Sequence, residues 1–304
     1  MSRIDPEIDD VASVFSFLGN DVRLAILESL YDRTIVAGPL TESETYTKVR
    51  EDAGVSDSGR FSYHLDKLTG RFVSKTNDGY RLREPGREVV RLRRTGLFSE
   101  YPVVEPRPVD ADCYRCGSPV RVGYDNGHLL TQCSTCVGLF DHELVPSGTL
   151  TALAYPPSGV DTVDVEAAFD RAHVRVDRYL SMMAEGFCPE CGGDVTASFQ
   201  PCTDHDADEE SVCGDCLLSH PAFVRLSCEV CGQPRITHPL HAVSDREPVA
   251  GALHDRGVDA GWERFAEVMR WSTTVTDDEV VFGTPDGDRF AVAIGSGIEI
   301  RAAR

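Results

Sequence analysis

The sequence has no cysteine before residue 113 and no long run of apolar side chains. The first hundred residues must therefore fold on apolar packing alone. No apolar run approaches the roughly 20 residues that a membrane helix needs, and the acidic stretch 1–10 is unlike a signal peptide, which is basic and then apolar. We expect a cytoplasmic protein that divides its 304 residues into two or three domains.

Lysine is also scarce, since only Lys48, Lys67 and Lys75 occur among the 30 basic residues. The net charge of -20 is uneven, with a balance of -2 over residues 1–100 and of -18 over residues 101–304. Residues 56–94 reverse the sign, with ten basic groups against five acidic ones. A positive region in an acidic protein is a candidate anion-binding surface. The arginine bias and acidic surplus resemble halophilic proteins of salt-accumulating archaea.

Apolar residues recur at helical spacing over 11–18 and again over 22–30, which indicates one broken helix or two consecutive ones. A further helix is expected over 41–53, opened by a capping box in which Thr41 is followed three residues later by Glu44.

The next predicted helix runs from a cap at Ser56 or Asp57 to about Thr69 and carries two stripes. Apolar residues form one stripe, which suits burial in the domain. The other stripe offers the long donors and aromatic edge that a recognition helix needs in a DNA groove. The candidate DNA contacts on this helix and downstream are Ser58, Arg60, Ser62, Tyr63, His64, Lys67, Arg71, Lys75, Arg81 and Arg83.

Two short strands, 72–76 and 80–83, are expected to form a basic hairpin around Asn77-Asp78-Gly79. A further basic helix should follow over 85–97. Helix, turn, helix and basic hairpin together predict a winged helix-turn-helix.

Here the chain resembles a known family. The run from Phe17 to Leu27, FLGNDVRLAIL, is similar to the opening of ArsR-type winged-helix regulators, and the run from Asp57 to Leu65, DSGRFSYHL, to the recognition helix of their haloarchaeal branch. The similarity covers roughly residues 10 to 97. It implies a homodimer that binds double-stranded DNA, with the recognition helix in the major groove and the hairpin near the minor groove. Several metal sensors of this family carry a cysteine motif in the helix before the recognition helix, and this sequence has none there, so metal sensing at that place is not expected.

Ten of the eleven cysteines form five Cys-x-x-Cys pairs, a spacing that in a reducing compartment favours metal ligands over disulfides. Four of them, Cys113, Cys116, Cys133 and Cys136, flank a predicted hairpin with a turn at 125–127. This is the spacing of a zinc ribbon, whose four thiolates close a structural Zn²⁺ site.

A second ribbon is expected from Cys188, Cys191, Cys228 and Cys231, with strands 195–199 and 222–227 between them. An acidic insertion, residues 201–221, interrupts it. The insertion contains Cys202, His205, Cys213 and Cys216, which fit a third zinc site. Alternatively, Cys213 and Cys216 complete the second site or remain free. Two zinc ions per chain are therefore expected, and three if the insertion binds one.

An amphipathic helix is expected between the ribbons, from Val165 to Met183, with Gly186 as its cap. The ribbon-helix-ribbon order and the run GFCPECGG at 186–193 resemble a C-terminal domain of unknown activity attached to haloarchaeal winged-helix regulators. Beyond residue 247, two short helices and three strands are expected, with an apolar face around Trp262 that serves as core.

The fold class is therefore α+β: a winged helix-turn-helix over 1–100, a zinc ribbon over 101–160, a connecting helix over 161–187, and a second ribbon with its insertion and C-terminal elements over 188–304. We expect a dimeric DNA-binding transcriptional regulator with a zinc-stabilised dimerisation or sensing domain. A protein-interaction adaptor is the alternative. A zinc hydrolase or deaminase is disfavoured, because His-Glu-x-x-His is missing, no His-x-Glu precedes a Pro-Cys-x-x-Cys, and the quartets leave no open position.

Overall fold

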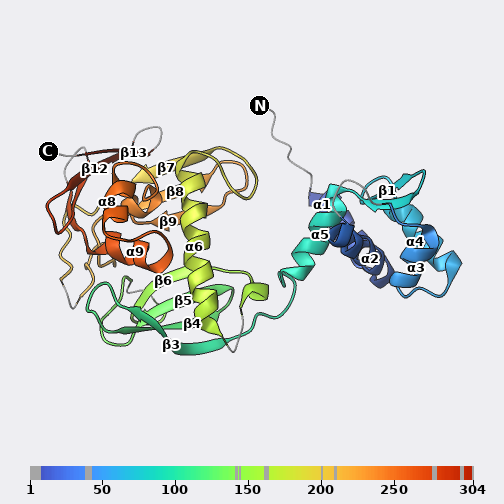
Figure 1. Ribbon diagram of the computed structural model, residues 1–304, viewed down its shortest axis with the longest axis horizontal. Helices are drawn as coiled ribbons and strands as arrows, with labels where there is room; N and C mark the ends of the chain where they lie inside the picture. The colour runs from blue at the N-terminus through green and yellow to red at the C-terminus, as the bar shows by residue number, and fades with distance from the viewer. Residues whose placement is uncertain are drawn as a thin grey trace. The chain divides into compact units, whose positions relative to one another are not determined.

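Contacts divide the chain into two compact units, Met1–Glu100 and Tyr101–Arg304, each of which is visible in Figure 1. The computed structural model describes residues 8–37, 43–140, 143, 145–160, 164–199, 201–208, 211–275, 279–294 and 298–302. In this described part, no helix is long and apolar enough to span a membrane.

The first unit consists of helices around one antiparallel hairpin. Its elements are α1 (Ile8–Leu18), α2 (Asp21–Ala37), α3 (Tyr46–Asp52), α4 (Ser58–Leu68), β1 (Val73–Thr76), β2 (Gly79–Leu82) and α5 (Glu84–Arg94). The core contains Ile26 and Leu27 of α2 and Phe61, Leu65 and Leu68 of α4, all fully buried or nearly so. The apolar stripe predicted for α4 is therefore confirmed as its buried face.

Most of these elements match the sequence prediction, but α3 does not. It begins at Tyr46 instead of residue 41, and Thr45 caps it by accepting a hydrogen bond from the Lys48 amide. A helix starting at residue 41 is wrong for this segment, because the backbone of Glu44 pairs with Tyr80 of β2 in two hydrogen bonds of 2.8 Å. A long-range strand pairing thus overrides the local sequence signal for a helix start. Thr41 itself lies outside the described residues.

The second unit contains three antiparallel sheets and four α-helices within its described residues. The first sheet has the order β3 (Val104–Asp112), β4 (Pro119–Asp125), β5 (His128–Cys133) and β6 (Thr149–Ala154); the second has β7 (Val195–Phe199), β8 (Val224–Cys228) and β9 (Pro234–Thr237); and the third has β10 (Ser272–Val275), β11 (Val280–Gly283), β12 (Arg289–Ile294) and β13 (Ile298–Ala302). The helices are η1 (Pro157–Gly159, a 3-10 turn), α6 (Val165–Ala184), α7 (Pro239–Ala242), α8 (Val249–Asp255) and α9 (Gly261–Arg270).

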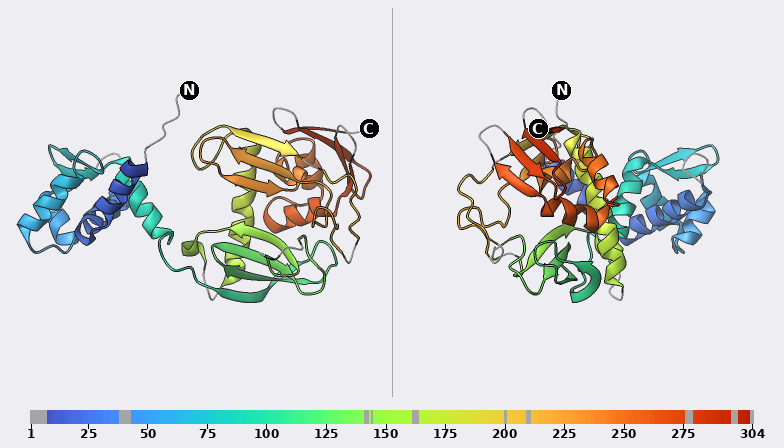
Figure 2. Two further views of the ribbon diagram at one scale, coloured as in Figure 1. Left: turned by 180° about the vertical axis from the view of Figure 1, so that it is seen from behind. Right: turned by 60° about the vertical axis from the view of Figure 1, so that its left-hand side comes forward.

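Helix α6 connects the cores of this unit. Its first half buries Phe169 and Ala172 against the first sheet, and its second half buries Leu180 and Met183 with residues of the second and third sheets. Figure 1 and Figure 2 show α6 running from the β3–β6 sheet to the β7–β9 sheet, with α8 and α9 beside it. The ribbon-like segments therefore share one folded unit with the C-terminal elements.

The predicted hairpins form as expected. Strands β4 and β5 pair around Asn126 and Gly127, whose φ values of 43° and 79° make the tight turn. Strands β7 and β8 pair in register from Val195↔Cys228 to Phe199↔Val224. Strands β3, β6, β9 and β10 and helix α7 were not predicted, because their sequences show no clear apolar period and they form by pairing with or packing on distant segments.

Candidate functional site

Four thiols at the end of the first ribbon-like hairpin meet at one point. Cys113 and Cys116 precede β4, while Cys133 ends β5 and Cys136 follows it. The Sγ atoms of Cys113 and Cys136 are 3.7 Å apart, and those of Cys116 and Cys133 are 3.5 Å apart. The structure thus brings together all four residues predicted for the first metal site.

The second predicted quartet also converges. The Sγ atoms of Cys188 and Cys231 lie 3.8 Å apart, and those of Cys191 and Cys228 lie 3.5 Å apart. Cys188 and Cys191 precede β7, whereas Cys228 ends β8. Because this quartet is complete, Cys213 and Cys216 are not needed here, and the alternative that places them in the second site is wrong.

Cys213 and Cys216 instead meet the other two ligand candidates of the insertion. The Sγ atoms of Cys202 and Cys213 are 3.8 Å apart, and the Sγ of Cys216 is 3.5 Å from Nδ1 of His205. The ligand atoms of each of the three groups all lie within 4.8 Å of one another. The insertion therefore holds a third group positioned for a metal ion.

Four of the five Cys-x-x-Cys pairs adopt the same tight turn. The amide four residues after the first cysteine donates to the carbonyl of that cysteine, at distances from 2.8 to 3.1 Å. This residue has a left-handed backbone in each case: Gly117 (φ 71°), Gly192 (φ 70°), Gly232 (φ 74°) and Leu217 (φ 58°). Leucine is rare in this conformation, so the turn after Cys213 keeps the shared geometry without the glycine that favours it.

The turns also present backbone amides to sulfur. The Cys228 Sγ accepts hydrogen bonds from the amides of Val230 and Cys231 at 3.4 and 3.5 Å. The Cys231 and Val230 amides outweigh the opposing effect of desolvation and lower the pKa of Cys228 to about 6. An amide that donates to sulfur stabilises the thiolate, which is the form that ligates metal.

The three groups fit a tetrahedral ion. Zn–S bonds of about 2.3 Å imply sulfur-to-sulfur distances of about 3.8 Å in a tetrahedron, and the distances above lie between 3.5 and 3.8 Å. Thiolate and imidazole ligands suit Zn²⁺. All four positions of each group come from the protein, which leaves no vacancy for a substrate.

The acidic insertion has few apolar residues of its own, but contacts with the first ribbon-like hairpin hold it in place. Arg115, inside the first Cys-x-x-Cys turn, donates from Nη2 to the carbonyls of Asp208 and Ser211 at 2.9 and 3.3 Å. Phe140 forms a β-bridge with Leu218. The third group therefore docks against the first ribbon-like hairpin, although its sequence lies within the second.

In the first unit, α4 separates the two predicted stripes. Arg60 and Tyr63 are exposed by 53% and 56%, and Ser58, Lys67 and Arg71 are also exposed. Asp57 caps the helix by accepting hydrogen bonds from the amides of Gly59 and Arg60.

Two of the predicted DNA contacts on α4, His64 and Ser62, are not exposed. His64 is only 8% exposed, and burial, followed by the charges of Arg23 and Arg60, lowers its pKa below the usual value. The prediction that His64 is exposed was therefore wrong, because His64 lies at the edge of the face of α4 that buries Phe61, Leu65 and Leu68. Ser62 is half-buried, with its hydroxyl 2.7 Å from that of Tyr46.

The hairpin continues the exposed basic surface. Lys75 of β1 and Arg81 of β2 are exposed, and so is Arg83, which precedes α5. Val73 and Leu82 of the same strands are buried. Buried and exposed side chains therefore alternate along the strands, and the basic side chains are on the exposed face of the hairpin.

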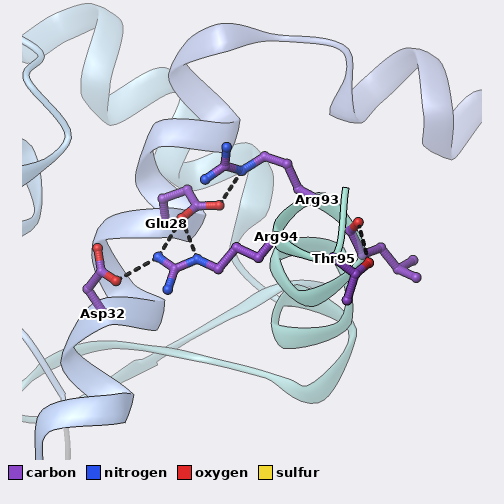
Figure 3. A network of polar contacts seen from close by, with 6 residues as sticks. Glu28, Asp32, Arg93, Arg94 and Thr95 are labelled. Atoms are coloured by element: carbon purple, nitrogen blue, oxygen red, sulfur yellow. Dashed lines mark hydrogen bonds and ion pairs between the residues drawn. The ribbon is translucent and has the colours of Figure 1, made fainter. Parts of the chain in front are cut away.

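The arginines of α5 behave differently. Arg93 contacts Glu28 at 2.5 Å, and Arg94 contacts Glu28 and Asp32 of α2 at 2.7 and 2.6 Å. Figure 3 shows both guanidinium groups turned toward the two carboxylates. These side chains therefore tie α5 to α2.

A buried polar network in the second unit was not predicted from the sequence. Asp177 of α6 is 5% exposed and accepts hydrogen bonds from Nε2 of His241 and from the amide of Gly261, both at 2.7 Å. The His241 Nδ1 lies 3.1 Å from the Thr237 hydroxyl. The sequence offered one signal for this network, which is the charged residue Asp177 among the apolar positions of the helix predicted over 165–183.

Family comparisons agree with the division into two units. A family described as a domain of unknown function (DUF7351) matches residues 110–297, more than half of the chain, and the chain belongs to this family. A second, described as a domain of unknown function (DUF7347), matches residues 11–92. No curated protein and no solved structure matches the chain.

Proposed function

We propose that this chain is a sequence-specific DNA-binding transcriptional regulator whose first unit is a winged helix-turn-helix. The observation that carries the proposal is the division of α4 into a buried face and an exposed face bearing Arg60, Tyr63 and Lys67. A helix of this kind fits the major groove of B-DNA, where arginine and lysine read guanine edges.

The surroundings of α4 support the same role. The exposed cations of the hairpin extend the positive surface toward the position that a wing takes beside the groove. Arg60 lies 3.3 Å from Asp21, but both side chains are exposed. An exposed ion pair contributes at most about 1 kcal/mol, so Arg60 can exchange this partner for a base or a phosphate.

A homodimer is part of the proposal. The first unit exposes apolar side chains on its outer helices, including Val11 and Phe15 of α1 and Leu92 of α5, which are 38%, 61% and 41% exposed. Val11 and Phe15 lie one turn apart on the same helix face. A second copy would cover these faces and double the number of base pairs that are read.

For the second unit we propose three Zn²⁺ ions with a structural role. Zinc bound by four protein ligands contributes folding free energy and holds short strands together. Closed centres leave no place for a metal-activated water, so catalysis is not part of the proposal. The abundance of thiol ligands favours the reducing cytoplasm as the location.

The proposal is tested by selecting preferred duplexes from a random pool with the purified full chain. Arg60→Ala should weaken binding to the selected site by about 1 to 3 kcal/mol and relax the preference at one position, because a bidentate base contact is lost. Arg81→Ala should weaken binding to all duplexes alike. The selected site should contain two related half-sites.

Arg94→Ala is the matched control, since its guanidinium is engaged with Glu28 and Asp32. This variant should retain specific affinity within about a factor of two, measured by fluorescence anisotropy at fixed salt. Equal affinity of Arg60→Ala and the unaltered chain for the selected site would show that α4 does not read bases. Failure to select any duplex would remove the DNA-binding proposal altogether.

A further inference from the structure

A cavity of about 380 Å³ lies within the second unit, and the described residues that line it include no cysteine. Its walls come from the first sheet, α6, β9, α7 and α9. Apolar side chains such as Val176, Leu180 and Phe265 form much of its lining. Small-molecule sites are concave, mostly apolar and of about 300 to 1,000 Å³, and this volume suits a compact molecule.

The charge of the lining is opposite to that of the unit. Residues 101–304 carry a balance of -18, yet among the described residues that line the cavity there is no aspartate or glutamate, whereas Arg175, Arg235 and four of the nine histidines line it. A positive, concave surface in an acidic unit attracts anions selectively, because the low-dielectric walls focus its field.

Both arginines are held beside the cavity. Arg175 is exposed on α6 and donates from Nη1 to the Ala154 carbonyl of β6 at 3.2 Å. Arg235 is half-buried on β9, and its guanidinium lies 4.5 Å from the ring centroid of Tyr179. Within the described residues neither pairs with a carboxylate, so both keep donors for an anion.

The lining also contains a buried, neutral histidine. His173, 1% exposed, lies with Nε2 3.4 Å from the Thr151 hydroxyl. Burial lowers the pKa of His173 to about 4, so its ring is neutral at pH 7. A charged group on a ligand is consequently favoured at the two arginines, and an apolar body is favoured against Val176, Leu180 and Phe265.

We propose that this cavity binds a small organic acid with one carboxylate and a compact apolar body. The carboxylate lies between Arg175 and Arg235, whose guanidinium groups can each form charge-assisted hydrogen bonds. The apolar body packs against Val176, Leu180 and Phe265. This site does not rest on the proposed DNA binding, because every residue that forms it belongs to the second unit.

Calorimetric titration of the metal-loaded full chain with octanoate and with 3-phenylpropionate tests the proposal without DNA. At least one acid should bind with a Kd below about 1 mM, and the corresponding alcohol, 1-octanol or 3-phenyl-1-propanol, should bind at least tenfold more weakly. Arg175→Gln and Arg235→Gln should each weaken binding of that acid about tenfold, the loss expected for one charged hydrogen bond.

Arg178→Gln is the matched control, since Arg178 is exposed on the same helix but does not line the cavity. It should leave the affinity unchanged, whereas Val176→Trp should abolish binding by filling the cavity. An unchanged far-ultraviolet circular dichroism spectrum would establish that each variant is folded. The proposal is overturned if neither acid binds at 5 mM, if the alcohols bind as tightly as the acids, or if both arginine variants bind as tightly as the unaltered chain.

Discussion

Asp177 shows how one residue can join several elements. Its carboxylate, on α6, accepts hydrogen bonds from His241 of α7 and from the amide of Gly261, where α9 begins. A buried carboxylate is costly unless it is fully paired, and here each oxygen has a donor at 2.7 Å. The cost of burial is thereby offset, and the three helices are fixed relative to one another.

We expect Asp177→Asn to destabilise the second unit by about 2 to 3 kcal/mol. The amide group of asparagine places a donor against either the Gly261 amide or Nε2 of His241, and hydrogen bonds to charged groups contribute about 1.5 to 3 kcal/mol. Urea unfolding followed by tryptophan fluorescence measures the loss. Asp170→Asn, at an exposed position of the same helix, should change stability by less than about 0.5 kcal/mol, and an equal effect of both substitutions would contradict this role of Asp177.

The acidic insertion, residues 201–221, is an element without regular secondary structure of its own in its described residues. Its order comes from the Arg115 hydrogen bonds, the Phe140–Leu218 bridge and the third ligand group. Because the insertion buries few apolar side chains, a bound metal would contribute a large share of its stability.

Elemental analysis of the purified chain should give close to three zinc ions per chain. Cys202→Ser combined with His205→Ala should reduce this number to two, because two ligands cannot hold the ion. His254→Ala, which alters an exposed histidine outside the three groups, should keep all three. Two zinc ions in the unaltered chain that persist in the double variant would show that the insertion binds no metal.

At the scale of the whole molecule, the two units differ in charge and in chemistry. The first is nearly balanced and contains no cysteine, whereas the second has a balance of -18 and all eleven cysteines. Both tryptophans, Trp262 and Trp271, lie in the second unit. Tryptophan fluorescence therefore reports the unfolding of that unit alone.

Acid should destabilise the second unit through its buried histidines. Desolvation lowers the pKa of His173 and of His220 to about 4, and it also lowers that of His238 well below its usual value. For His173, the Phe169 carbonyl and Asp177 oppose this shift, and His241 adds to it. Below pH 6.5 the unfolded chain binds protons that the folded unit excludes, so stability is lost as the pH falls from 6.5 toward 4.

His173→Gln should reduce this loss by roughly 1.5 kcal/mol between pH 6.5 and pH 5, since each pH unit is worth at most about 1.4 kcal/mol per excluded proton and the unfolded histidine is only half protonated at pH 6.5. The measurement is the urea midpoint at both pH values, with zinc present. Protonation of the thiolates affects the variant and the unaltered chain equally, so it cancels in the comparison. An identical pH dependence in both proteins would indicate that His173 does not contribute.

The sequence by itself determined the features that depend on local spacing. The Cys-x-x-Cys pairs predicted two of the ligand quartets and allowed the third, and the Asn126-Gly127 turn predicted the β4–β5 hairpin. The stripes of α4 and α6 followed from helical periodicity. These signals are reliable because the residues that carry them lie within a few positions of one another.

The tertiary structure decided what depends on distant partners. The pairing of Glu44 with Tyr80 moved the start of α3, and the surrounding helices buried His64. Docking on the first hairpin placed the insertion, and packing around α6 created the Asp177 network and the cavity. In each case a local conformational preference is worth only about 1 kcal/mol. Contacts made across the fold outweigh it, and those contacts cannot be read from neighbouring positions in the chain.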